Sequence, residues 1–104
     1  MDNEQIAFNI IMYAGNARAK AYDAVAEAKK GDFNGAYSLI KESGDEIIKA
    51  HNIQNSIITR EANGDHFEIT LLMVHAEDHL MSAISAKDYA SEMIELYKRL
   101  NEKW

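Results

Sequence analysis

The chain has 104 residues, 47% hydrophobic and 27% charged, a balance typical of one ordinary globular domain. Its formal net charge of −6, with eleven scattered Lys and Arg residues, argues against a nucleic-acid partner. The absence of cysteine excludes disulfides and thiolate nucleophiles, and no apolar run approaches the ~20 residues that cross a bilayer.

The first predicted helix spans residues 3–30. Proline is absent from the chain, and apolar residues recur here at every third or fourth position, which is the helical period. Asp2 or Asn3 can cap the start, and Gly31 provides a conventional stop. The resulting apolar stripe consists of Ile6, Ile10, Tyr13, Ala17, Ala21, Ala24 and Ala28.

The second predicted helix spans residues 33–63 and begins within the short connection GDFNG, residues 31–35. Gly44 is its weak point, because a break there would divide it into two helices. A single glycine costs only about 1 kcal/mol relative to alanine in a helix, so we expect a continuous or slightly bent helix.

The third predicted helix spans residues 67–102 and contains neither proline nor glycine. Three long helices joined by short loops predict an all-α fold, an antiparallel up-down-up three-helix bundle that occupies residues 1–104 as one domain. The third helix is apolar on more than one face. This predicts that part of its surface meets another subunit.

The segment LLMVHAEDHLM, residues 71–81, combines His75, Asp78 and His79 in an apolar setting. Residues three and four apart are neighbours on a helix, so these side chains form one polar patch. Three interpretations are open: a metal site, buried histidines paired with an aspartate, or a nucleophilic histidine. The zinc-protease pattern requires glutamate directly after the first histidine, and Ala76 stands there instead.

A histidine nucleophile needs little else from the chain. An ordinary imidazole has a pKa of about 6.5 and is mostly neutral at pH 7, so a ring nitrogen can attack a phosphoryl group without a separate base. Such a histidine must be accessible on a rigid element, with donors for phosphate oxygens and an apolar surface for a docking protein.

The segment VHAEDHLM resembles the active-site segment VHAQDHLM of the lactose/cellobiose-type enzyme IIA proteins of the bacterial sugar phosphotransferase system. AHNIQNSIITREANGD, residues 50–65, is similar to the AHxxQTxLIxxEAxG stretch of that family. The GDF turn at residues 31–33 and the first predicted helix fit as well, so the resemblance covers nearly the whole chain.

The resemblance implies a cytoplasmic homotrimer of three-helix bundles. In it, His75 accepts a phosphoryl group from the phosphocarrier HPr and passes it to the cysteine of a IIB component, during uptake of a cellobiose-, chitobiose- or lactose-class disaccharide. A IIC permease recognises the sugar and is the only link to the membrane. Asp78 matches the family aspartate that meets its symmetry mates around a divalent cation, commonly Mg²⁺, at the trimer axis.

The sequence departs from the family pattern at Glu77, where an anion replaces the usual glutamine beside the phosphorylated position. Gln54 and His79 are supporting candidates, either as donors to phosphate oxygens or as packed helix residues. The other two histidines, His51 and His66, are expected to be structural or exposed. The alternative functions are a non-catalytic metal-binding oligomer with His75, Asp78 and His79 as ligands, or a plain helical interaction module.

Overall fold

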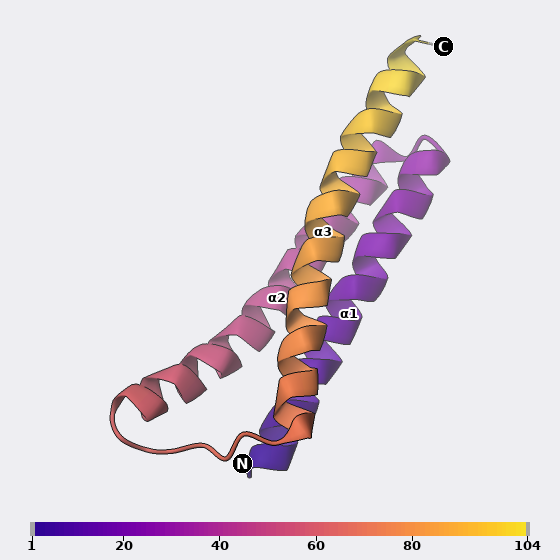
Figure 1. Ribbon diagram of the computed structural model, residues 1–104. Coiled ribbons are helices and arrows are strands. Elements are labelled where there is room, and N and C mark those ends of the chain that lie inside the picture. Colours follow the sequence, from indigo (N-terminus) through magenta and orange to yellow (C-terminus); the bar gives the residue numbers. More distant parts are fainter. Residues whose placement is uncertain (1, 104) are drawn as a thin grey trace.

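The computed structural model describes residues 2–103 as three long helices: α1 (Asn3–Lys29), α2 (Phe33–Ala62) and α3 (Leu71–Lys103). The helices run up, down and up along a rod of 58 × 20 × 17 Å (Figure 1). The predicted antiparallel three-helix bundle is confirmed. None of the helices in the described part of the chain is long and apolar enough to cross a membrane.

Each helix begins at a side chain that accepts a hydrogen bond from a backbone N–H of its first turn. Asp2 accepts from the Gln5 N–H at 2.8 Å, and Asp32 accepts from the Gly35 N–H at 2.9 Å. For α3 the acceptor is the Thr70 hydroxyl, 3.1 Å from the backbone nitrogen of Met73. These caps satisfy amide groups that have no partner inside the helix.

The third helix begins at Leu71, four residues later than expected. Residues 65–70 form a non-helical crossing from α2 to α3. Within it Phe67 is buried in the core, and the guanidinium of Arg60 lies 4.5 Å from its ring centroid. Phe67 therefore anchors the loop, and Thr70 sets the start of the helix.

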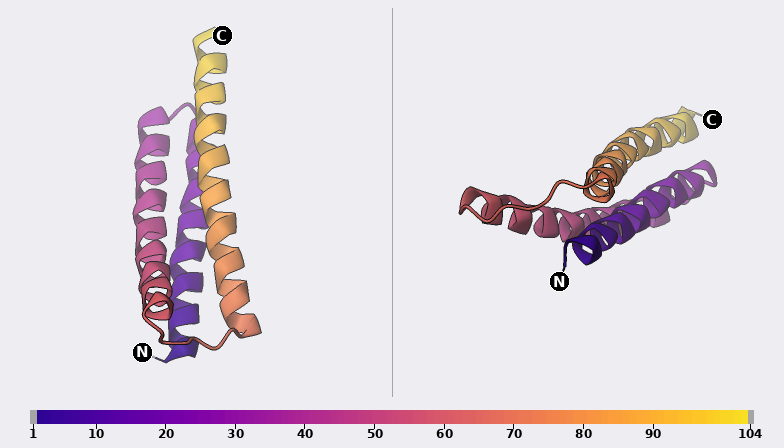
Figure 2. Two further views of the ribbon diagram at one scale, coloured as in Figure 1. Left: turned by 60° about the vertical axis from the view of Figure 1, so that its left-hand side comes forward. Right: turned by 60° about the horizontal axis from the view of Figure 1, so that its bottom comes forward.

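The second helix is continuous through Gly44, as expected. Its C-terminal half leans away from α1 and α3 (Figure 1; Figure 2, right). The long side chain of Lys87 on α3 packs against Gly44, since a Cβ at that position would lie 3.4 Å from the Lys87 Cε. The glycine thus makes room for a neighbouring helix without interrupting α2.

Alanines allow α1 to pack closely against both other helices. Its buried face contains every member of the predicted stripe except Tyr13, which is half-buried, and also includes Ala7 and Ala14; Ile10 is the largest fully buried side chain of α1. From α3, Leu80 and Ile94 complete the core. The buried hydroxyl of Ser43 donates to the carbonyl oxygen of Ala17 at 2.7 Å, so this polar group is satisfied.

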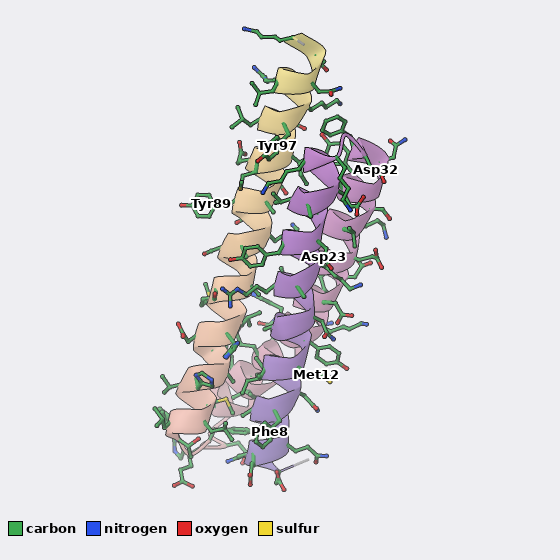
Figure 3. The ribbon with its side chains drawn as sticks, turned by 90° about the vertical axis from the view of Figure 1, so that its right-hand side faces the viewer. Phe8, Met12, Asp23, Asp32, Tyr89 and Tyr97 are labelled. Atoms are coloured by element: carbon green, nitrogen blue, oxygen red, sulfur yellow. The ribbon has the colours of Figure 1, made fainter. Side chains whose placement is uncertain are left out.

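One face of α3 points directly away from the core. We call it the outer face of α3; its members are exposed and comprise the apolar or aromatic Leu71, Val74, Tyr89 and Leu96 and the polar Asp78, Ser82, Ser85 and Glu92. Leu71 is 85% exposed, and Tyr89 is 72% exposed and projects away from the bundle (Figure 3). Four large apolar or aromatic side chains exposed on the side opposite the buried residues are typical of a helix that packs against another chain.

Replacing Gly31 with alanine is expected to lower the free energy of unfolding by about 1 kcal/mol, because Gly31 closes α1 at a φ of 88°, where a Cβ is strained. Gly15→Ala is the matched control: the glycine lies inside α1 and has open space around it, so alanine should raise stability by about 0.5–1 kcal/mol. Urea denaturation of both variants measures the difference. Equal effects of the same sign would contradict this account of the turn.

Candidate functional site

His75 lies in the second turn of α3 and is exposed to solvent. With Leu71 and Leu72 it lines a shallow hollow of about 390 Å³. The imidazole therefore stands on a rigid helix beside apolar side chains. This is the accessible placement that a nucleophilic role requires.

His75 and His79 form a close pair on one side of α3. Their Nε2 atoms are 3.1 Å apart, the ring centroids are 4.4 Å apart, and the rings are nearly perpendicular at 87°. Because a neutral imidazole has one N–H and one lone pair, one Nε2 donates to the other in this contact. The i and i+4 spacing thus brings the Nε2 atoms of the two histidines together, as the sequence pattern predicted.

Asp78 does not join the histidine pair. Three residues along an α-helix correspond to a rotation of about 60° past a full turn, and this places Asp78 on the outer face of α3 while His75 lies on its flank. Within residues 2–103, no group of three or more His, Asp, Glu or Cys side chains is positioned to hold a metal ion. A single chain therefore does not form a metal site from His75, Asp78 and His79.

Gln54 and Glu77 meet between α2 and α3. The Gln54 amide donates a hydrogen bond to the Glu77 carboxylate. Glu77 is two residues from His75, a rotation of about 160° on the helix, so its charge faces α2 and not the imidazole. Within one chain, the Gln54 amide is thus hydrogen-bonded to Glu77, on the side of α3 opposite His75.

A small apolar groove surrounds that hydrogen bond. It measures about 230 Å³ and is lined by residues from the C-terminal half of α2 and from the start of α3: Gln54, Ile57, Ile58, Glu61, Ile69, Met73, Val74 and Glu77. The other two histidines, His51 and His66, are exposed and lie outside it.

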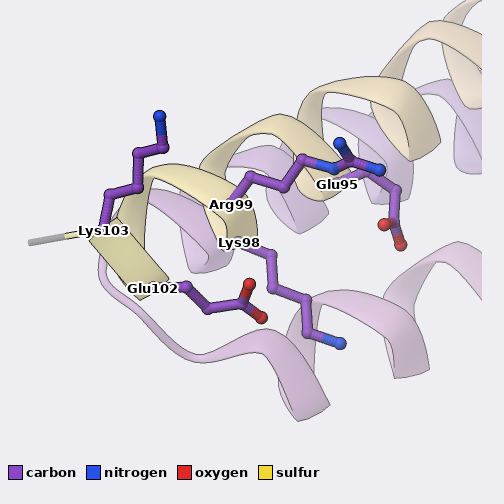
Figure 4. Close-up of a pocket in the computed structure, with 5 residues that line it drawn as sticks. All are labelled: Glu95, Lys98, Arg99, Glu102 and Lys103. Carbon is purple, nitrogen blue, oxygen red and sulfur yellow. The ribbon is translucent and has the colours of Figure 1, made fainter.

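A larger hollow, about 460 Å³, lies at the opposite end of the rod, where α3 extends past the turn between α1 and α2 (Figures 1 and 4). Its walls are charged side chains, and these splay apart along the helix surface instead of converging on one point (Figure 4). The lining residues are Glu95, Lys98, Arg99, Glu102 and Lys103. Charges of both signs on an open surface are typical of a solvated helix end.

Two features of the site could not be read from the sequence pattern. Thr70 is a cap without the usual Glu or Gln three residues later, because Met73 stands there, so only its place before an apolar run could have indicated it. The partnership of Gln54 with Glu77 joins residues on two helices, and no local spacing predicts it.

The family described as the lactose/cellobiose-specific IIA subunit of the PTS system matches residues 5–98. The lichenan-specific phosphotransferase enzyme IIA component of Bacillus subtilis is 48% identical over 100 residues, covering 96% of this chain and 91% of that protein. The lactose-specific EIIA component of Lactococcus lactis is 44% identical and covers 90% of each chain.

Two solved structures share the fold over nearly the whole length. The crystal structure of the cellobiose-specific enzyme IIA from Bacillus anthracis has a TM-score of 0.96 and 41% identity, covering 100% of this chain and 96% of that one. The chitobiose IIA protein of Escherichia coli, solved in complex with HPr, has a TM-score of 0.85 and 33% identity, covering 97% and 98% of the two chains. The likeness thus extends to a relative that binds HPr.

Proposed function

Because the chain belongs to the lactose/cellobiose-specific IIA family of the bacterial sugar phosphotransferase system, we propose that it carries a phosphoryl group on His75 from HPr to a IIB component. The observation that carries this proposal is the accessible imidazole of His75, set on a rigid helix beside an apolar hollow. The HPr complex of the chitobiose relative supports HPr as the donor.

In the proposed transfer, a ring nitrogen of His75 forms a bond to phosphorus while the bond between phosphorus and the donor protein breaks. In the second transfer, the thiolate of the IIB cysteine forms a bond to phosphorus, the bond between phosphorus and the His75 nitrogen breaks, and the imidazole regains its lone pair. Both steps take place between proteins, and the apolar hollow formed with Leu71 and Leu72 offers a surface on which each partner docks in turn.

His79 is the proposed positioning residue. Its Nε2 lies 3.1 Å from the Nε2 of His75, so it is within reach of an oxygen of a phosphoryl group bound to His75. An N–H of His79 that donates to that oxygen would hold the phosphoryl group in one orientation and stabilise its negative charge.

The transported sugar is proposed to be a β-linked disaccharide of the cellobiose, chitobiose or lactose class. The support is the set of relatives, which are specific for lichenan, lactose, cellobiose or chitobiose. We place the protein in the cytoplasm, where it would meet HPr, and assign recognition of the sugar to a IIC permease.

We also propose that three copies assemble through the outer face of α3, with Asp78 near the threefold axis. Two carboxylates ~4 Å apart repel by about 1 kcal/mol in a water-like medium and by about 4 kcal/mol at an effective dielectric of 20, and a trimer has three such pairs. Carboxylate oxygens suit Mg²⁺, which would offset this repulsion, so the donor set fits the ion. Its role there would be structural.

Replacement of Asp78 by leucine is expected to keep or strengthen the trimer. The substitution removes three mutually repelling charges from an apolar interface, so the mass measured by sedimentation should stay that of a trimer and become insensitive to EDTA. The wild-type assembly should weaken in EDTA. Asp23→Leu, at an exposed position on α1, is the control and should respond to EDTA like the wild type. A monomeric Asp78→Leu variant would contradict the proposed interface.

The proposed function is tested by incubating the protein with phosphorylated HPr and measuring acid-labile phosphate on the chain. Phosphate that depends on His75 supports a phosphocarrier. If no acid-labile phosphate forms on the wild-type protein, the proposed function is wrong, and the helical interaction module remains as the alternative.

A further inference from the structure

We propose that His75 and His79 together form a binding site for a first-row transition metal ion such as Zn²⁺, and that the bound ion blocks phosphoryl acceptance. The second part rests on the proposed function, because it assigns the nucleophile to His75. The first part rests only on the geometry of the pair.

The separation of the two Nε2 atoms fits a shared metal ion. Zinc binds histidine nitrogen at about 2.0–2.1 Å, so two imidazoles on one ion have nitrogens about 3.3 Å apart at a tetrahedral angle and about 2.9 Å apart at a right angle. The observed separation of 3.1 Å lies between these two values. The side chains therefore need no change of helix geometry to chelate an ion.

The surroundings of the pair also favour chelation. The rings are nearly perpendicular, with centroids 4.4 Å apart, so they do not stack on each other and hide their nitrogens. Chelation through both Nε2 atoms requires the tautomer with the proton on Nδ1 in both histidines, which a neutral imidazole can adopt, so the N–H···N contact is exchanged for two bonds to the ion. The torsion that turns an imidazole is soft, and a modest rotation of each ring then directs both Nε2 lone pairs to one point. His75 is exposed, so water molecules can complete the coordination shell of the ion.

This site differs from the proposed cation site at Asp78 in both position and chemistry. Asp78 lies on the outer face of α3, about 60° around the helix from His75. Mg²⁺ prefers oxygen ligands, whereas imidazole nitrogens select zinc, nickel and copper. Excess Mg²⁺ should therefore not compete at the histidine pair.

A metal ion on the pair takes up the lone pair of the His75 Nε2. It also withdraws electron density from the ring and occupies the position next to the nitrogens. Phosphoryl acceptance by the metal-bound protein should therefore fall, and removal of the ion should restore it.

The binding experiment uses the full chain without a histidine tag, titrated with ZnCl₂ in a calorimeter with excess Mg²⁺ present. We expect one zinc ion per chain, and affinity at least ten-fold weaker in His79→Gln. His51→Gln is the matched control, because His51 is an exposed histidine on α2 that is not part of the pair, and the affinity of this variant should equal that of the wild type. Equal zinc affinity in His79→Gln and wild type would overturn the site.

The activity experiment measures phosphate uptake from phosphorylated HPr with and without saturating zinc. For the wild type, zinc should reduce the rate at least five-fold, and EDTA should restore it. In His79→Gln the basal rate should fall because the positioning residue is lost, but the ratio of the rates with and without zinc should be near unity; this ratio also controls for effects of zinc on HPr. If the wild-type protein binds zinc but accepts phosphate from HPr at an unchanged rate, the proposed inhibition is wrong. If the wild-type protein accepts no phosphate even without zinc, the proposed function is refuted instead.

Discussion

Replacing His75 with glutamine is expected to reduce phosphoryl acceptance from HPr to background. The variant keeps a polar side chain of similar size on α3 but has no ring nitrogen that can bond to phosphorus. Removal of a nucleophile commonly costs several orders of magnitude in rate. The measurement is acid-labile radiolabelled phosphate on the chain after incubation with labelled phospho-HPr.

The fold of the His75→Gln variant should be intact, because exposed positions seldom change the free energy of unfolding by more than about 0.5 kcal/mol. His51→Gln serves as the matched control, with full phosphate uptake expected. If the His75→Gln variant still accepts phosphate from HPr, another histidine must be the nucleophile. His79 would be the first to test, because its Nε2 lies 3.1 Å from that of His75.

The largest effect on stability is expected from Ile10→Ala on α1. Ile10 is 0% exposed and belongs to the core cluster that also contains Leu80 and Phe67. Truncation of a buried isoleucine to alanine leaves a cavity and typically costs about 2–5 kcal/mol. Urea unfolding followed by circular dichroism measures this loss as a lower transition midpoint.

Ile48→Ala is the control, because Ile48 is also an isoleucine within a helix but is 57% exposed. Alanine is the better helix former, so this variant should change stability by less than about 0.5 kcal/mol. Both variants must be compared at one protein concentration, since oligomerisation contributes to apparent stability. Similar losses in the two variants would show that Ile48 is covered in the assembled protein.

The fold was largely predictable from the helical period. The expected ends of the first two helices, at residues 30 and 63, fall one residue beyond the observed ends at Lys29 and Ala62. The start of α3 was wrong by four residues, because residues 65–70 continue the apolar pattern while the chain crosses between helices. Phe67 is buried by the fold of the whole chain, and the spacing of apolar residues does not distinguish such a loop residue from one on the buried face of a helix.

The site was predictable where its residues share one helix. The i and i+4 spacing predicted that His75 and His79 would meet. Asp78, which the sequence pattern grouped with them in one polar patch, lies instead about 60° around the helix on the outer face. Glu77 appeared from its sequence position to bring a negative charge near the imidazole. The rotation of about 160° around α3 directs this charge away from the imidazole, and only the partner, Gln54 on α2, could not be predicted from the sequence.

The late start of α3 has an electrostatic consequence for His75. If α3 began at residue 67, His75 would stand in its third turn; because α3 begins at Leu71, the imidazole lies in the second turn, and helical side chains lean back toward the first. A phosphoryl group there, with close to two negative charges, would sit one turn closer to the positive end of the helix macrodipole, whose effect is about 0.3–1 kcal/mol in the first turn and falls off beyond it. By linkage, the phosphorylated chain should resist fraying of this end of α3 by the same amount.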